Sequence, residues 1–219
     1  MAAGRIAGIN PSSNILVLDS GFGEGVCTLA SEFRCKISAF DSCKTKNKEA
    51  HSLAINKGVS HLVSLNGDFF TTELEPGTFE LAILEKSALS SKKRSVLLAR
   101  VQELLQMRGW LAFSVPIKLA DSVPNKILSC FEDGGGKIEK EEFYRSLIEN
   151  SGFDIHFTGL VPQSGWDNYF SHLACHLGDE KGYYADALMK IRSHQQIDAF
   201  YRLEASRYIG YLFCIARKI

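Results

Sequence analysis

The stretch "ILVLDSGFGEG", residues 15–25, decides the fold. An apolar run that ends in an aspartate and three glycines predicts a buried strand followed by a tight turn into a helix. Gly21, Gly23 and Gly25 have no Cβ, so the backbone can turn sharply and a ligand can lie directly against it. We therefore expect a ligand at the carboxyl end of this strand.

The alternation of strand and helix continues along the chain. We expect strands over 14–20, 35–42, 61–68, 79–88, 110–116, 153–161 and 207–219, and helices over 24–33, 44–58, 91–109 and 139–152. Gly58, Gly109 and Gly152 are predicted to end helices, and Pro116 to end a strand. Strands separated by helices of this length predict parallel pairing, with crossover helices on both faces of the sheet.

Composition and charge argue against several classes of protein. The chain has 219 residues, and Lys plus Arg equals Asp plus Glu at 25 each, so its formal net charge is zero. Broad nucleic-acid binding needs a basic surface, so we expect no nucleic-acid partner. No apolar run reaches the roughly 18 residues of a membrane span, and the first residues lack the layout of a signal peptide. Six cysteines without a CxxC pair fit free thiols in the cytoplasm.

An acid at the end of the second strand indicates which kind of ligand is expected. Asp41 follows Gly23 by 18 residues, where an acid binds the two hydroxyls of a ribose. A nucleoside is therefore expected across the first two strands; the alternative is a purely structural turn with a surface aspartate. The G-x-G-x-G spacing differs from that of dinucleotide sites, and Glu24 would repel a phosphate at the helix start. A cationic ligand without phosphate is favoured.

These motifs resemble those of the class I S-adenosylmethionine-dependent methyltransferases. "VLDSGFGEG" (17–25) is similar to the family's first motif, V-L-D-x-G-x-G-x-G, and Asp41 matches its ribose-binding acid. "NGDFF" (66–70) is similar to the segment after the third strand, where Asp68 would bind the adenine amino group and Phe69 would flank the ring. "SRYIGYLFCIARK" resembles the last strand of the small-molecule branch, including the quinone-biosynthesis C-methyltransferase type.

The resemblance implies one domain over residues 1–219 with an α/β, Rossmann-like fold. Its seven-stranded sheet would be mostly parallel, with helices on both faces and the last strand antiparallel. The cofactor would be S-adenosylmethionine, with S-adenosylhomocysteine as product, and the acceptor a small molecule. The cofactor-binding residues implied are Asp19, Gly21, Phe22, Gly23, Gly25, Asp41, Ser42, Gly67, Asp68, Phe69 and Glu85.

One carboxylate is expected to have a catalytic role. "FELAILEKSAL" (79–89) matches the fourth strand of the family, whose end faces the methyl group, and Glu85 is its best-placed carboxylate. A hydroxyl, a protonated amine or an acidic carbon needs a base before it accepts a methyl group, and Glu85 is the candidate. The alternative is that Glu85 only holds the methionine part of the cofactor or a nearby loop.

The chain departs from the family's pattern at several places. Phe22 stands where a small residue or cysteine is usual, Glu85 where Asp or Asn is usual, and Met107-Arg108 replace the usual Pro-Gly before the fifth strand. Relatives also carry a few dozen helical residues before the first strand, which cover the cofactor. We expect the cofactor here to be more open, or to be covered by residues 162–207 or by the second subunit of a homodimer.

Residues 162–207 have no strand pattern and are rich in aromatics and histidines, and we expect them to form a mobile, mostly helical lid over the acceptor pocket. His172 and His176 share a helix face, but no third ligand is in view, so no metal is expected. Five aromatic residues would either line the pocket or hold the lid in place: Trp166, Tyr169, Phe170, Tyr183 and Tyr184.

Other activities remain as alternatives. A protein or RNA methyltransferase is one, although "LEKSA" stands where base and glutamine methylating enzymes commonly carry an N-P-P-Y-like signature. A catalytically inactive methyltransferase-like binding protein is another. Cys175 and Cys214 invite comparison with arsenite methyltransferases, but the adjacent cysteine pairs are missing.

Overall fold

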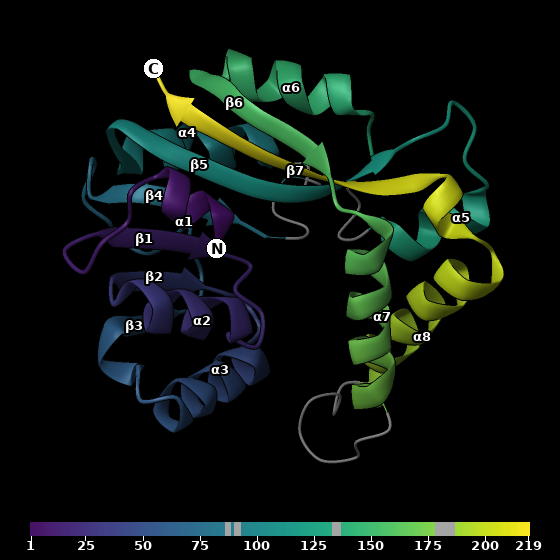
Figure 1. Cartoon of the computed structure of the whole chain (residues 1–219), viewed down its shortest axis with the longest axis horizontal. Coiled ribbons are helices and arrows are strands. Elements are labelled where there is room, and N and C mark those ends of the chain that lie inside the picture. The colour runs from purple at the N-terminus through teal and green to yellow at the C-terminus, as the bar shows by residue number, and fades with distance from the viewer. Residues whose placement is uncertain (86–88, 90–92, 133–136, 178–186) are drawn as a thin grey trace.

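A single seven-stranded sheet forms the centre of the protein (Figure 1). The computed structural model describes residues 1–85, 89, 93–132, 137–177 and 187–219, without the side chains at 172, 175, 176 and 187–189. The strands are β1 (Asn14–Leu18), β2 (Lys36–Phe40), β3 (Val63–Asn66), β4 (Phe79–Leu84), β5 (Leu105–Lys118), β6 (Phe153–Leu160) and β7 (Ile209–Lys218). They lie side by side in the order β3-β2-β1-β4-β5-β7-β6.

The direction of the strands matches the expected fold. β3, β2, β1, β4 and β5 pair in parallel, and β7 is inserted antiparallel between β5 and β6. The prediction of a mostly parallel, seven-stranded sheet with an antiparallel last strand is therefore confirmed. The carboxyl ends of β1, β2, β3 and β4 consequently meet at one edge, where the predicted site residues follow them.

Helices cover both faces of the sheet (Figure 1). They are α1 (Ala2–Ile6), α2 (Glu24–Phe33), α3 (Lys44–Asn56), α4 (Arg94–Leu104), α5 (Asn125–Phe131), α6 (Glu141–Asn150), α7 (Gln163–Leu177) and α8 (Ala187–Arg202), with 3₁₀ turns at Ser60–Leu62 and Ala205–Arg207.

The residues of β1 show why its sequence is continuously apolar. Ile15 and Val17 pack in a core with α1, α2 and α3, while Leu16 and Leu18 pack in a second core with α4 and α6. A strand buried on both faces has no solvent side, so it shows no alternation of polar residues.

The junction between α4 and β5 differs from the prediction. The helix expected over 91–109 ends at Leu104, so the prediction that Gly109 ends it is wrong. Leu105 already pairs with Phe79 of β4, and the next pair is Leu81 with Trp110, so the intervening residues form an irregularity in β5 rather than a last helical turn. Strand pairing overrides the helical pattern of this segment.

Pro116 does not end β5 either, because the strand continues to Lys118. Pairing with β4 ends at Phe113, and beyond that point β5 is paired with β7 on one side. On its other side, this part of β5 makes an isolated bridge between Ile117 and Glu139 rather than a regular ladder, so the missing N–H of a proline is tolerated there.

The region 162–207 contains α7 and α8, which pack together and against α5 in a third core. Phe170 stacks on Phe200 with ring centroids 4.5 Å apart, and Trp166 stacks on Phe200 at 5.5 Å. The aromatic residues therefore join the two helices to each other. The expected movement of this region as a lid stays a prediction.

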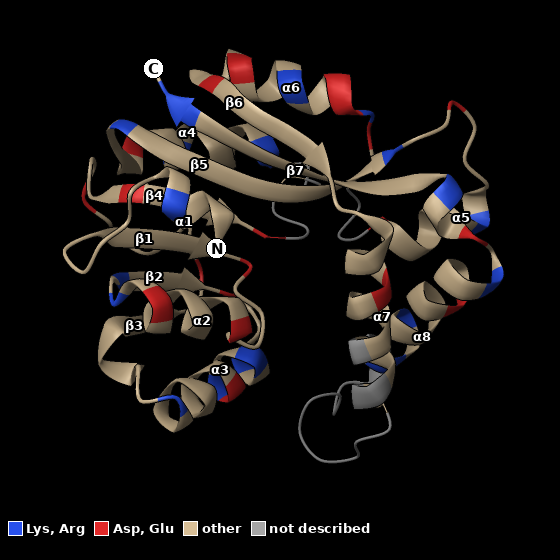
Figure 2. Cartoon of the chain, in the orientation of Figure 1, with Lys and Arg blue, Asp and Glu red and all other residues tan. Residues whose placement is uncertain are grey.

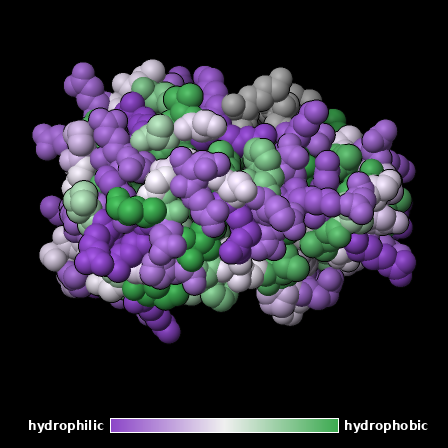
Figure 3. Space-filling model, turned by 90° about the horizontal axis from the view of Figure 1, so that it is seen from above, coloured by the Kyte–Doolittle hydropathy of each residue, from purple (hydrophilic) through white to green (hydrophobic). Residues whose placement is uncertain are grey.

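Lys, Arg, Asp and Glu are interspersed over the helices and loops (Figure 2), and the chain has 25 residues of each sign. The face seen from above in Figure 3 is mainly hydrophilic, with hydrophobic residues in small groups. In the described part of the chain, no helix combines the length and the apolar character that crossing a membrane requires.

We predict that Gly23→Ala lowers the free energy of unfolding by about 2 to 4 kcal/mol. Gly23 has φ +83°, and a Cβ there would lie 2.7 Å from the Cβ of Ala50 in α3. Gly58→Ala is the matched control, because Gly58 has φ +68° and open space around it, so only the backbone strain of about 1 to 2 kcal/mol applies. Urea unfolding measures both; equal losses would show that contact with Ala50 does not matter.

Candidate active site

The turn after β1 alternates between left-handed and ordinary backbone. Asp19, Gly21 and Gly23 have φ of +58°, +59° and +83°. Ser20 between them still donates its N–H to the carbonyl of Phe40, at 3.1 Å, so the turn stays attached to the end of β2. Asp19 is one of the few residue types other than glycine that adopt this conformation without a large cost. The predicted glycine turn is thus a defined loop that ends where α2 begins.

The third glycine of the motif lies against a carboxylate. A Cβ at Gly25 would be 3.1 Å from Oε1 of Glu85, which follows β4. The backbone N–H of Glu85 is donated to the carbonyl of Leu18, at 3.1 Å, which holds Glu85 beside the end of β1. The structure therefore brings the predicted catalytic residue to the predicted cofactor turn, at the N-terminus of α2, where the helix dipole favours negative charge.

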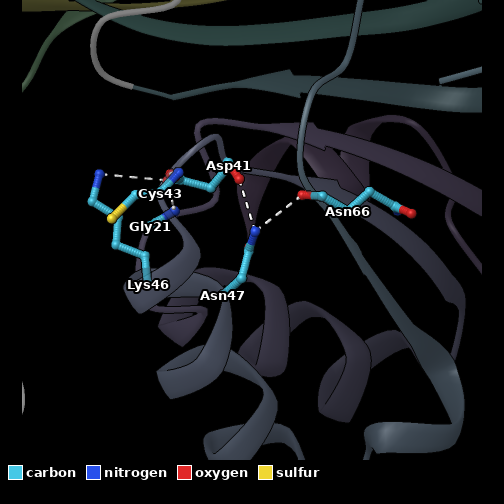
Figure 4. Close-up of polar contacts among 6 residues, drawn as sticks. All are labelled: Gly21, Asp41, Cys43, Lys46, Asn47 and Asn66. Atoms are coloured by element: carbon cyan, nitrogen blue, oxygen red, sulfur yellow. Dashed lines mark hydrogen bonds and ion pairs between the residues drawn. The ribbon is translucent and has the colours of Figure 1, made fainter. Parts of the chain in front are cut away.

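Asp41 connects the turn after β1 to the loop after β2 (Figure 4). Its Oδ2 accepts the N–H of Gly21 at 3.0 Å, and its Oδ1 accepts the N–H of Cys43 at 2.9 Å. Nζ of Lys46 lies 3.5 Å from Oδ2. The residue is only 5% exposed, so these contacts compensate the cost of burying its charge. Each carboxylate oxygen can accept more than one hydrogen bond, which leaves acceptor capacity for a ribose.

Asn47 is a site residue that sequence reasoning missed. From α3 its Nδ2 donates to the carbonyl of Asp41 at 2.8 Å and to that of Asn66 at 3.2 Å, so one amide joins the ends of β2 and β3 (Figure 4). Its Oδ1 is buried and has no hydrogen-bond partner. The sequence does place an asparagine in the helix that follows the predicted acid. Its role could not be predicted, because it depends on β2 and β3 being neighbours.

The loop after β3 holds the residues expected near the adenine. Asp68 is exposed, and its Oδ1 accepts the N–H of Phe70 at 2.8 Å. Phe69 is only 6% exposed; its ring lies edge-on to Phe40 at 5.5 Å and under the guanidinium of Arg100 at 4.9 Å. Phe69 therefore packs in the core, and contacts of either residue with a base stay predictions.

The remaining predicted residues lie around the same edge. Ser42 and Gly67 are exposed at the ends of β2 and β3, and Phe22 is half-buried in the turn after β1. The structure thus gathers the predicted cofactor residues along the carboxyl edge of β1, β2, β3 and β4. Their contacts with a cofactor are not tested by this arrangement.

Two cavities meet at the ends of β4 and β5. The first, of about 320 Å³, extends from α2 to α1 and is lined by residues including Gly25, Glu85 and Ser114. The second, of about 200 Å³, faces α7 and is lined by Glu85, Ser114, Val161, Gly165, Trp166, Tyr169 and Tyr211. Because Glu85 and Ser114 line both, the end of the glycine turn and helix α7 lie on opposite sides of this carboxylate.

The aromatic residues of the expected lid have different positions. Trp166 and Tyr169 line the second cavity, whereas Phe170 is buried in the stack with Phe200. Tyr183 and Tyr184, and the side chains of His172, Cys175 and His176, lie outside the described residues. Among the residues described, no three His, Cys, Asp or Glu side chains cluster as a metal site would require.

Five of the six cysteines have side chains in the described part of the chain. Cys27, Cys35, Cys43, Cys130 and Cys214 are free. Burial raises the pKa of Cys214 to about 12, so its thiol stays protonated and packs as an apolar side chain.

The strand order, the inserted antiparallel β7 and the glycine turn joined to an acid define the class I methyltransferase fold. Two solved structures share it. A putative sarcosine dimethylglycine methyltransferase from Galdieria sulphuraria has a TM-score of 0.78 at 15% identity, with 99% of this chain and 83% of that chain covered. The [4+2]-cyclase SpnF also has a TM-score of 0.78, at 17% identity, with 99% and 78% covered.

The chain is also similar in sequence to a characterised type of methyltransferase. The sarcosine/dimethylglycine N-methyltransferase of Halorhodospira halochloris is 26% identical over 152 residues, which cover 67% of this chain and 53% of that protein. The chain thus spans about half the length of this relative. No family model matches the chain. The chain therefore has the fold of the class I S-adenosylmethionine-dependent methyltransferases and is similar in sequence to an N-methyltransferase.

We predict that Asn47→Ala lowers the free energy of unfolding by about 1 to 3 kcal/mol, because the carbonyls of Asp41 and Asn66 each lose a hydrogen bond from the amide. Ser52→Ala in the same helix is the control, since Ser52 is exposed and bonds only to the carbonyl of Lys48. That control is expected within about 0.5 kcal/mol of the parent. Denaturant titration compares the two, and an unchanged Asn47→Ala variant would mean that the amide does not join the strands.

Proposed function

We propose that this chain is an S-adenosylmethionine-dependent methyltransferase with a small-molecule acceptor. One observation carries the proposal. The glycine turn is bonded to Asp41 and lies beside Glu85, and Glu85 also lines the second cavity at the carboxyl edge of the sheet. The name of the Halorhodospira relative, which states methyl transfer to sarcosine and dimethylglycine, supports it. A cytoplasmic location and a homodimer are parts of the same proposal.

The residues present fit this cofactor. Asp41 would hold the ribose hydroxyls, and the turn at residues 19–25 would lie against the amino-acid part. Gly25 has no Cβ, so Oε1 of Glu85 can lie close beside this turn. Glu24 and Glu85 line the first cavity, and carboxylates suit a cationic ligand without phosphate. The cofactor supplies an electrophilic methyl group when it is bound.

The chain's own residues would position and activate the acceptor. Glu85 lines both cavities and is the carboxylate that can accept a proton from the acceptor's nucleophilic atom. Trp166 and Tyr169 would cover the second cavity and exclude water from it. The acceptor must lie in line with the transferred group, so the walls of this cavity contribute through orientation.

We predict micromolar binding of S-adenosylmethionine and S-adenosylhomocysteine, which corresponds to about 8 kcal/mol. Asp41→Ala should weaken it by about ten- to a hundredfold, because a charge-assisted contact with two hydroxyls is lost. Asp154→Ala, which removes an exposed carboxylate of β6, is the control and should bind like the parent. Isothermal titration calorimetry on variants with intact thermal transitions measures both. Absence of binding to the folded parent would overturn the proposal.

We also predict that Glu85→Gln lowers kcat by about 10²- to 10⁴-fold for an acceptor that must lose a proton. The substitution preserves shape and removes the base, so affinity for S-adenosylhomocysteine should change much less than kcat. Transfer of a labelled methyl group to a panel of small acceptors provides the measurement. The shared fold of a cyclase makes product detection necessary, since cofactor binding alone does not establish methyl transfer. A parent that binds the cofactor and methylates no acceptor would leave the inactive binding protein as the function.

A further inference from the structure

The second cavity combines aromatic rings with a carboxylate. Trp166 and Tyr169 of α7 and Tyr211 of β7 line it, together with Glu85. Trp166 lies edge-on to Tyr211, with ring centroids 4.8 Å apart and an interplanar angle of 74°. Three aromatic side chains and one carboxylate therefore line a volume of about 200 Å³.

The rings are held in place by structure outside the cavity. Trp166 stacks on Phe170 at 5.7 Å and on Phe200 at 5.5 Å, which fixes its plane against the third core. The N–H of Val161 is donated to the carbonyl of Tyr211 at 2.9 Å, so the segment just before α7 is attached to β7. The cavity wall is thus formed before any ligand enters, which reduces the ordering cost of binding.

The electrostatics of the cavity favour a cation. The faces of aromatic rings carry partial negative charge and attract cations, and quaternary ammonium groups are commonly bound by such cages. Glu85 adds a carboxylate at the end of β4. Burial, and secondarily the neighbouring Tyr169, raises the pKa of Tyr211, so this phenol stays neutral at physiological pH and acts as a ring and hydrogen-bonding group.

We propose that the aromatic cavity of Trp166, Tyr169, Tyr211 and Glu85 binds a small methylated ammonium, and that the acceptor is therefore a small amine. This inference rests on the proposed function and specifies its substrate class. The volume of about 200 Å³ is below the roughly 300 Å³ at which pockets for larger ligands begin, so the amine end of the acceptor is small.

Charge balance explains why such a cavity suits this reaction. The lone pair of a tertiary amine forms the new N–C bond, the S–C bond breaks with its electron pair remaining on sulfur, and the positive charge moves from sulfur to nitrogen. No proton is released. A secondary amine that forms a neutral product also loses one proton, which Glu85 can accept. The cation thus arises beside the aromatic rings, which stabilise it as it forms.

Ligand binding tests the inference without catalysis. The probes are choline and its uncharged isostere 3,3-dimethylbutan-1-ol, which has carbon in place of the ammonium nitrogen. Isothermal titration calorimetry, with and without saturating S-adenosylhomocysteine, is expected to show choline bound at least about tenfold more tightly than the isostere. Equal affinity for the two probes, or no binding of choline under either condition, would overturn the inference.

A pair of variants locates the interaction. Tyr169 is 43% exposed, so its substitution should leave the core intact. Tyr169→Leu removes the ring and is expected to weaken choline binding by about three- to tenfold, whereas Tyr169→Phe keeps the ring and is expected to bind choline within about twofold of the parent. Glu85→Gln should also weaken choline binding and reduce the preference over the isostere. Parent-like choline binding by Tyr169→Leu would place the cation elsewhere and overturn the assignment.

The same titrations separate this inference from the proposed function. The parent protein could bind choline more tightly than the isostere and yet not bind S-adenosylhomocysteine. That result would support the cation site and overturn the methyltransferase proposal. Binding of S-adenosylhomocysteine by a parent that does not discriminate between the probes would leave the methyltransferase proposal standing and overturn the amine as its acceptor.

Discussion

The carboxyl edge of the sheet depends on the two main-chain hydrogen bonds that Asp41 accepts. The bond from Gly21 holds the turn after β1, and the bond from Cys43 holds the loop that leads into α3. Since these segments carry most of the predicted cofactor residues, one buried carboxylate arranges the geometry of the others. Its charge is compensated in the fold by backbone dipoles and by Lys46, which explains how an acid can be nearly covered at an open edge.

Much of this edge could be predicted because its signals are local. The limits of α2 match the predicted helix over 24–33, and the glycines and Asp41 mark the ends of two strands directly. A buried apolar run, a turn that needs positive φ and a helix start are all encoded within a few residues of one another. The hand of the crossovers between parallel strands then follows.

The parts that were not predicted depend on contacts between distant segments. Residues 105–109 look helical and end in a glycine, but pairing of Leu105 with Phe79 places them in β5. The pattern also cannot show that Asn47 reaches Asn66, since that contact exists only when β3 lies beside β2. The second cavity is even less predictable from the sequence, because Ser114, Trp166 and Tyr211 are far apart in the chain and meet only after α7 folds against the sheet.

The position of Glu85 between two cavities links the charges on either side of it. One carboxylate can fully compensate one neighbouring cation at a time, and a second cation brought close to the first is repelled by it. On the proposed reaction, a neutral amine would therefore enter beside the sulfonium more readily than its protonated form. After transfer the sulfur side is neutral and the nitrogen side is charged, so the attraction of Glu85 is directed entirely to the methylated product. The shared carboxylate would then attract the methylated amine more strongly than it attracts the spent cofactor.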